Sequence, residues 1–182
     1  MGPSDEQLVE RIVRHDDRHA FALLVKRYQS EIRNSLRRLT HGDHALADDL
    51  AQETFVRVHR SIASFQGDSL FRTWLHRIAY RCFLSEARKR TLSTETLEEH
   101  HSVAEDETEQ DGFMQDFNRA MMLLSQPQRE AVHFSLQQGF AHPDIADIMG
   151  IPVGTVKTHV LRGRQKLQEL LSEWKEDASN ER

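Results

Sequence analysis

Apolar residues recur at three- and four-residue steps along most of the chain, the spacing that places them on one face of an α-helix. In the first half this pattern predicts four helices: a short one beginning at Ser4, a long one ending before His41, a third over about 44–62 and a fourth over about 70–90. Ser4 with Gln7 three residues later predicts a capping box at the first start. No stretch alternates apolar and polar residues for long enough to predict a sheet.

The second half predicts more helices and ends in a helix-turn-helix. Pro127 restarts the chain between two helices, and Pro143 opens a short helix that Gly150 closes. A long final helix then begins at Val153 or Gly154. Two helices joined by so short a turn have helix-turn-helix proportions. We therefore expect an all-α protein.

Residues 91–112 form an acidic segment between the two halves. Residues 91–116 carry nine acids and no Lys or Arg. Such a segment lacks the apolar surface that would offset its ordering entropy, so it predicts a flexible linker. We expect two small helical domains, over residues 4–90 and 113–174, joined by this acidic flexible linker.

The net charge of −5 argues at first against a nucleic-acid partner. Removing the nine acids of the linker region from the total of 29 leaves 20 acidic against 24 basic residues. Residues 69–90 hold six basic side chains and one acid, and residues 153–166 hold four and none. Two local basic faces are typical of a DNA-binding protein.

The third predicted helix carries an acidic face opposite its apolar stripe, with Val56 among the acids. We expect no Lys or Arg one turn later to pair with these acids. Most charged helix faces are simply solvated, but unpaired acids around an apolar side chain favour a protein interface. The candidate interface residues are Asp48, Asp49, Gln52, Glu53 and Val56.

The fourth predicted helix and the loop before it combine basic and aromatic side chains, which suits melted DNA. Lys and Arg hold phosphates, while an aromatic or loop pocket takes an unstacked base, with stacking contributing about 1–3 kcal/mol per base. The alternative is that the aromatic residues form core, and we prefer this for Phe71 and Trp74. The candidate contacts are Phe65, Gln66, Asp68, Ser69, Arg72, Arg77, Tyr80, Arg81 and Arg88.

The final helix predicts a reader of duplex DNA. Val156, Val160, Gly163 and Leu167 share one face, which leaves the opposite face for the major groove. Arg can bind guanine and Gln can bind adenine, each pair discriminating by about 1–3 kcal/mol. The groove-facing candidates are Thr155, Thr158, Arg162 and Gln165, and the phosphate-binding candidates are Lys157, Arg164 and Lys166.

Three stretches of the chain resemble one family. Residues 48–55 (DDLAQETF) resemble conserved region 2.2 of the extracytoplasmic-function sigma factors of the sigma-70 family, residues 67–79 (GDSLFRTWLHRIA) resemble their regions 2.3 and 2.4, and residues 145–158 (IADIMGIPVGTVKT) resemble their helix-turn-helix. Three places depart from the family pattern. Tyr80-Arg81 stands where relatives often carry Arg-Asn, and Ser85 stands where an Asp is common. Ala141 leaves the helix-turn-helix without the usual hydroxyl N-cap, so that Pro143 must set the helix start.

The resemblance implies a sigma factor that directs RNA polymerase core to specific promoters and assists promoter opening in transcription initiation. Its first motif docks on the clamp helices of the polymerase's largest subunit, and by that match Asp49, Gln52 and Glu53 bind the core. The loop and the fourth helix take the −10 element, and the helix-turn-helix takes the −35 element. The expected partners are RNA polymerase core, through the clamp helices and the flap, promoter DNA and an anti-sigma factor.

Catalysis, metal binding and membrane insertion are not expected. His41 and His44 flank a turn without a plausible third or fourth ligand, and no nucleophile elbow or phosphate-binding glycine loop appears. We therefore predict no enzyme, no cofactor and no metal. Cys82 is the single cysteine, so no internal disulfide forms. With no signal peptide and no apolar run near the roughly 20 residues that span a bilayer, we expect a cytoplasmic protein.

Two other classes of protein compete with this interpretation. Residues 155–159 also resemble the recognition helix of two-component transcription regulators, but that class should carry an α/β receiver domain upstream, where this chain predicts helices. An all-helical adaptor that binds only protein predicts no DNA affinity, and the two basic faces argue against it.

Overall fold

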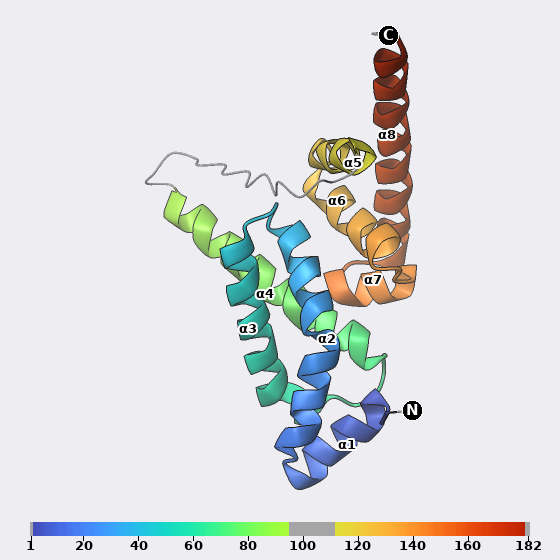
Figure 1. Ribbon diagram of the computed structural model, residues 1–182. Coiled ribbons are helices and arrows are strands. Elements are labelled where there is room, and N and C mark those ends of the chain that lie inside the picture. Colours follow the sequence, from blue (N-terminus) through green and yellow to red (C-terminus); the bar gives the residue numbers. More distant parts are fainter. Residues whose placement is uncertain (1, 95–111, 181–182) are drawn as a thin grey trace. The chain divides into compact units, whose positions relative to one another are not determined.

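The computed structural model describes residues 2–94 and 112–180, and every regular element in these ranges is a helix (Figure 1). The helices fall into two compact units, the first holding α1 to α4 and the second α5 to α8. The all-α fold with two helical domains is thereby confirmed. The predicted domain boundaries stay predictions, and most of the predicted linker, residues 95–111, lies outside the described residues.

Short polar side chains set the helix starts in the first unit. The capping box predicted at Ser4 is present, Asp17 accepts a hydrogen bond from the backbone N–H of Ala20, and Asp43 accepts one from that of Leu46. The elements are α1 (Asp5–His15), α2 (Arg18–Leu39), α3 (His44–Ser61), the 3₁₀ turn η1 (Ile62–Ser64) and α4 (Phe71–Thr94). Helix α4 thus runs four residues beyond its predicted end.

The core of the first unit forms where α2 packs against α1, α3 and α4. Leu8, Leu24, Ile32 and Leu75 are among its fully buried side chains. The apolar residues predicted to face this core from α3 and α4 are buried except for Phe55 and Phe83, which are half-buried. The buried ones are Leu50, Ala51, Val58, Ile62, Trp74, Leu75, Ile78 and Cys82. Phe55 lines the surface described below.

In the second unit α5, α6 and α7 all pack against α8. Ala141 makes no capping hydrogen bond from its side chain, Pro143 lies in the first turn of α7, and Gly150 ends that helix at a φ of 68°, as predicted. The elements are α5 (Gly112–Met122), α6 (Gln126–Val132), the π-helical turn η2 (His133–Gln137), α7 (His142–Met149) and α8 (Val153–Asn180).

A glycine sets how closely α8 approaches α6. The predicted inward face of α8 is confirmed, because Val156, Val160 and Leu167 are buried together with Gly163. A Cβ atom on Gly163 would lie 2.5 Å from Cγ2 of Val132. This close contact fixes which side of α8 packs against α6, and therefore which side of α8 faces outward.

Candidate functional site

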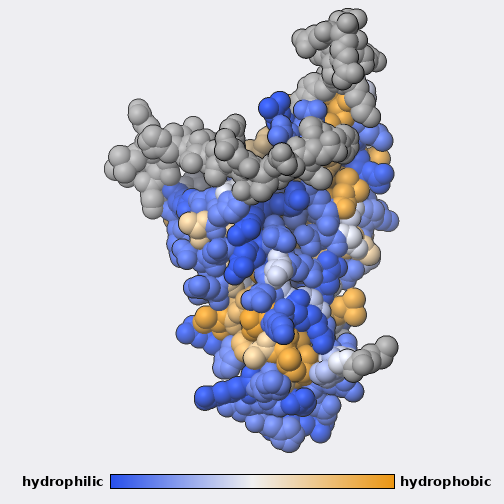
Figure 2. Space-filling model, viewed as in Figure 1, coloured by the Kyte–Doolittle hydropathy of each residue, from blue (hydrophilic) through white to orange (hydrophobic). Residues whose placement is uncertain are grey.

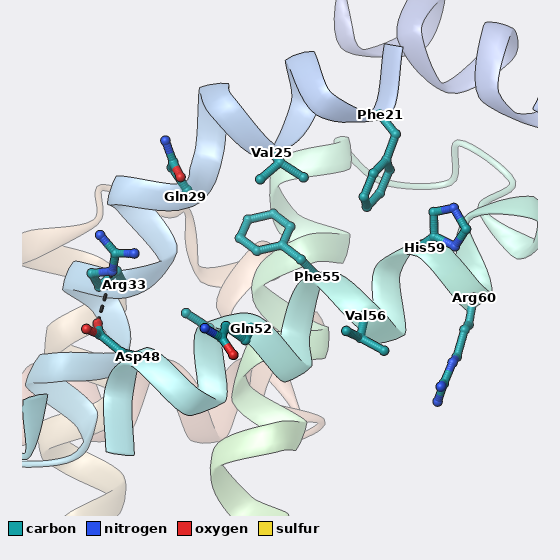
Figure 3. Close-up of a pocket in the computed structure, with 11 residues that line it drawn as sticks. Phe21, Val25, Gln29, Arg33, Asp48, Gln52, Phe55, Val56, His59 and Arg60 are labelled. Carbon is teal, nitrogen blue, oxygen red and sulfur yellow. Dashed lines mark ion pairs between the residues drawn. The ribbon is translucent and has the colours of Figure 1, made fainter. Parts of the chain in front are cut away.

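A groove of about 570 Å³ runs between α2 and α3 (Figure 3). Phe21 and Val25 enter it from α2, and Phe55 and Val56 enter it from α3. Figure 2 shows hydrophobic residues gathered over these two helices. The groove also receives polar side chains, so its full lining is Phe21, Val25, Gln29, Arg33, Asp48, Ala51, Gln52, Phe55, Val56, His59 and Arg60.

The predicted interface residues of α3 lie in or beside this groove. Asp48, Gln52 and Val56 line it, and Val56 keeps 42% of its surface exposed. Asp49 is exposed and Glu53 is half-buried on the same helix. The structure therefore brings these five residues to one surface of the first unit.

The expectation that no Lys or Arg pairs with these acids one turn later is wrong for Glu53, and Asp48 has a basic partner from another helix. Arg33 Nε lies 3.0 Å from Asp48 Oδ1, and Arg57 Nε donates a hydrogen bond to Glu53 Oε1 at 2.6 Å. That hydrogen bond is the main cause that lowers the pKa of Glu53. Arg57 stands one turn after Glu53, so the sequence already contained this pair, whereas Arg33 belongs to α2 and is brought close only by folding.

The predicted basic residues of α4 separate into two groups. Arg77, Arg81 and Arg88 are spaced by four and seven residues, which places them along one side of a helix with 3.6 residues per turn. Arg81 and Arg88 are exposed and Arg77 is half-buried. Tyr80 is only 5% exposed and lies among core residues, with its ring 6.1 Å from that of Phe83.

Arg72 lies away from that side and is tied to α2. Its Nε donates a hydrogen bond to Glu31 at 2.6 Å, and His76 Nε2 lies 2.9 Å from the same carboxylate oxygen. Burial of His76 lowers its pKa despite this acidic neighbour. Burial raises the pKa of Glu31, but the hydrogen bonds from His76 and Arg72 outweigh it and leave that pKa lowered. The charge of Arg72 is thus largely compensated within the unit.

The loop before α4 is anchored by one aromatic ring. Phe65 packs 5.3 Å from Trp74 and 5.7 Å from Phe71, ring centre to ring centre, and both of those rings are buried as expected. Gly67 turns the chain at a φ of 79°. The tip beside it presents Gln66 and Asp68 as exposed side chains, with Ser69 half-buried.

The predicted groove-facing residues of α8 lie on its outer surface. Thr155, Thr158, Arg162 and Gln165 are all exposed, as are Lys157 and Arg164. Lys166 is exposed too, but its Nζ donates a hydrogen bond to the carbonyl of Leu123 at 2.7 Å, just after the end of α5. Leu161 is also exposed on α8, although it was not among the predicted contacts.

Within residues 2–94 and 112–180, no group of three or more His, Cys, Asp or Glu side chains is placed to hold a metal ion. Among the helices of those same ranges, none combines the length and apolar character needed to cross a membrane.

Comparison with known proteins finds one family match in each of the two units. The family model for sigma-70 region 2 matches residues 24–92, and that for sigma-70 region 4 matches residues 114–167. The chain is 34% identical to the RNA polymerase sigma-H factor of Pseudomonas aeruginosa, over 92% of this chain and 93% of that protein. It is 32% identical to the extracytoplasmic-function (ECF) sigma-E factor of Haemophilus influenzae, over 91% and 94%.

A solved structure supports the match. The sigma factor RpoE of Bartonella quintana, crystallised with the anti-sigma factor NepR, superposes with a TM-score of 0.69 at 31% identity, covering 84% of this chain and 96% of that one.

Proposed function

The chain belongs to the sigma-70 family as an extracytoplasmic-function sigma factor, and from this premise we propose which of its surfaces bind the polymerase and which read the promoter. A sigma factor directs RNA polymerase core to specific promoters and supports transcription initiation there. Both regions that this task needs are present, region 2 in the first unit and region 4 in the second.

We assign polymerase binding to the groove between α2 and α3. The observation that carries this assignment is that an apolar floor of Phe55 and Val56 lies beside the acids Asp49 and Glu53 on the motif of region 2.2. An apolar floor with an acidic margin suits a helical partner that offers apolar side chains flanked by basic ones. By the family resemblance, that partner is the clamp helices of the polymerase's largest subunit.

Replacing Asp49 and Glu53 with Lys should weaken binding to core polymerase by at least about tenfold, because it reverses charge complementarity at the interface. Glu10→Lys is the matched control. Glu10 also pairs with an arginine one turn later, Arg14 at 3.0 Å, but on α1 and outside the groove. Affinity is measured with fluorescently labelled chain, and circular dichroism checks helical content. Undiminished binding by the folded double variant would contradict the assignment.

We assign the −10 element to α4 and the loop before it. In this proposal Arg77, Arg81 and Arg88 hold phosphates of the melted strand, since they follow one side of the helix. The loop tip, with Gln66, Asp68 and Ser69, takes the unstacked base. The remaining candidates, Phe65, Arg72 and Tyr80, act as positioning residues, because each is held by packing or by an ion pair.

We assign the −35 element to the outer surface of α8. Arg162 and Gln165 are the proposed base readers, with Thr155 and Thr158 beside them. Lys157 and Arg164 are the proposed phosphate contacts. Lys166 already donates one of its three N–H groups to the carbonyl of Leu123, which restricts its reach, so we propose that its contribution is the weakest of the three cations.

The proposed role needs no chemistry by the chain itself, because binding energy alone recruits the polymerase and favours open DNA. It places the protein in the cytoplasm with the polymerase and the chromosome. The Bartonella quintana relative was crystallised with an anti-sigma factor, and we propose that an inhibitor of this type also binds the present chain.

A further inference from the structure

The outer surface of α8 carries a leucine that the assignments above leave without a role. Leu161 is 58% exposed, although leucine is among the residue types most often buried. It follows Thr158 by three residues and precedes Gln165 by four, so all three share one side of the helix. That side is opposite Val156 and Val160, which are buried against the rest of the unit.

The neighbouring Thr158 adds to the apolar character of this position. Its Oγ1 donates a hydrogen bond to the carbonyl of Gly154, one turn earlier in α8, at 3.0 Å. The hydroxyl proton is therefore used within the helix, so toward a base edge Thr158 can offer only its γ-methyl group and the acceptor lone pairs of Oγ1. Leu161 and this methyl group lie one turn apart on the exposed side of α8, where Arg162 and Gln165 are exposed as well.

We propose that Leu161, with the methyl group of Thr158, reads a thymine of the −35 element through its C5-methyl group. The inference rests on the proposed function, since it requires α8 in the major groove. Thymine is the base that presents a methyl group there, whereas the other base edges present hydrogen-bonding groups that a leucine cannot satisfy. Contact with the methyl group removes apolar surface of both partners from water, and losing one methyl group weakens such a contact about fourfold.

Isolated exposed leucines are common and need no function, so a matched comparison is required. Leu136, on η2 of the same unit, is 46% exposed and lies outside α8. If Leu161 is only a solvated leucine, Leu161→Ala and Leu136→Ala should behave alike toward every promoter sequence. If Leu161 reads thymine, only its own substitution changes the base preference.

The experiment uses holoenzyme reconstituted from core polymerase and the full chain, with duplexes randomised through the −35 region as probe. We expect selection of thymine on one strand at a defined position, and loss of that preference in Leu161→Ala but not in Leu136→Ala. The selected duplex is then made with deoxyuridine at that position, which removes the methyl group and keeps every hydrogen-bonding group. This change should weaken wild-type binding about fourfold and leave Leu161→Ala unaffected.

Three results would overturn the proposal: no selected thymine, no effect of deoxyuridine on the wild type, or an equal effect on Leu161→Ala. The deoxyuridine comparison leaves the wild-type protein unaltered, so it holds even if a variant folds poorly. Arg162→Ala distinguishes a failure of the thymine contact from a failure of the −35 role of α8. If it relaxes base preference while Leu161→Ala does not, −35 reading by α8 stands and the thymine contact fails. If neither the wild type nor this variant shows a −35 preference, the role of α8 fails and the thymine contact fails with it.

Discussion

At His76 the protein buries an imidazole against a carboxylate, and this creates a residue-scale pH dependence. Burial lowers the pKa of His76, and Glu31 opposes that shift by hydrogen bond and charge. We predict that NMR titration of the His76 ring gives a pKa below the ordinary value of about 6.5. In Glu31→Gln the pKa of His76 should fall further, because the opposing carboxylate is gone. A ring that titrates at or above 6.5 in the wild type would contradict this account.

His76 and Glu31 also determine how the stability of the first unit changes with pH. The unfolded chain protonates His76 at a higher pH than the folded chain does, so the contribution of His76 to folding is complete above about pH 6.5 and is lost as the pH falls below it. Glu31, whose pKa is lowered from the ordinary value of 4.5, keeps its contribution down to about that pH and loses it as the pH falls further. Both effects destabilise the first unit in acid, so His76→Gln should flatten the decline between pH 7 and 5.5.

At this scale the sequence predicted which side chains are buried or exposed better than it predicted which side chains pair with one another. Helical spacing placed Phe71 and Trp74 in the core and Thr155 and Arg162 on the surface, because one element's periodicity decides these positions. Spacing within one helix could not show that Glu31 of α2 compensates Arg72, since such a pair forms between elements distant in sequence. Tyr80 shows that a face can be misassigned as well: it was predicted as a DNA contact, and its side chain is only 5% exposed.

At the scale of elements, Gly163 permits the close contact between α6 and α8. Gly163→Ala should destabilise the second unit by about 1–3 kcal/mol, because its Cβ would lie 2.5 Å from Cγ2 of Val132 and overpacking carries a cost of that size. Val132 is fully buried and its β-branched side chain has few alternative rotamers in a helix. The free energy of unfolding is measured by urea titration, followed through NMR signals of α6 and α8.

Gly154→Ala supplies the control for that measurement. Gly154 lies in the same helix, and a Cβ added there meets nothing within 4 Å, so this variant should be neutral or slightly stabilised by helix propensity. The loss in Gly163→Ala should also shrink in a Val132→Ala background, where the opposing methyl groups are gone. Equal stability of the two single variants would show that Gly163 has no packing role.

Helix starts and stops could be predicted from the sequence more closely than helix pairing. Ser4 and Gly150 mark their termini because capping depends on a few adjacent residues. Asp16 and Asp17 stand side by side and each could cap α2 by its residue type; the structure uses Asp17 for the cap, while Asp16 ends α1 with a φ of 48°. The groove between α2 and α3 was not predicted, because helical spacing in α2 indicates a core position for Phe21 and gives no role to Val25.

At the scale of the whole molecule, the account assigns separate tasks to the two units. The α2 and α3 groove and the −10 surface of α4 belong to the first, and the outer surface of α8 belongs to the second. A chain of this kind should fail in two distinguishable ways. Loss of the groove should weaken polymerase binding and with it all initiation, whereas loss of the α8 surface should leave the holoenzyme intact but unable to choose its −35 sequence.

The most direct test of this division is in vitro transcription by core polymerase from a library of genomic fragments, with the 5′ ends of the transcripts sequenced. The account predicts that wild-type chain produces discrete start sites sharing a −10 and a −35 element. Asp49→Lys with Glu53→Lys should strongly reduce the transcript yield at these starts, in line with its weaker core binding, and Arg162→Ala should keep the shared −10 element while degrading the −35 element. An undiminished transcript yield with the Asp49 and Glu53 variant, or wild-type start sites that share neither a −10 nor a −35 element, would contradict it.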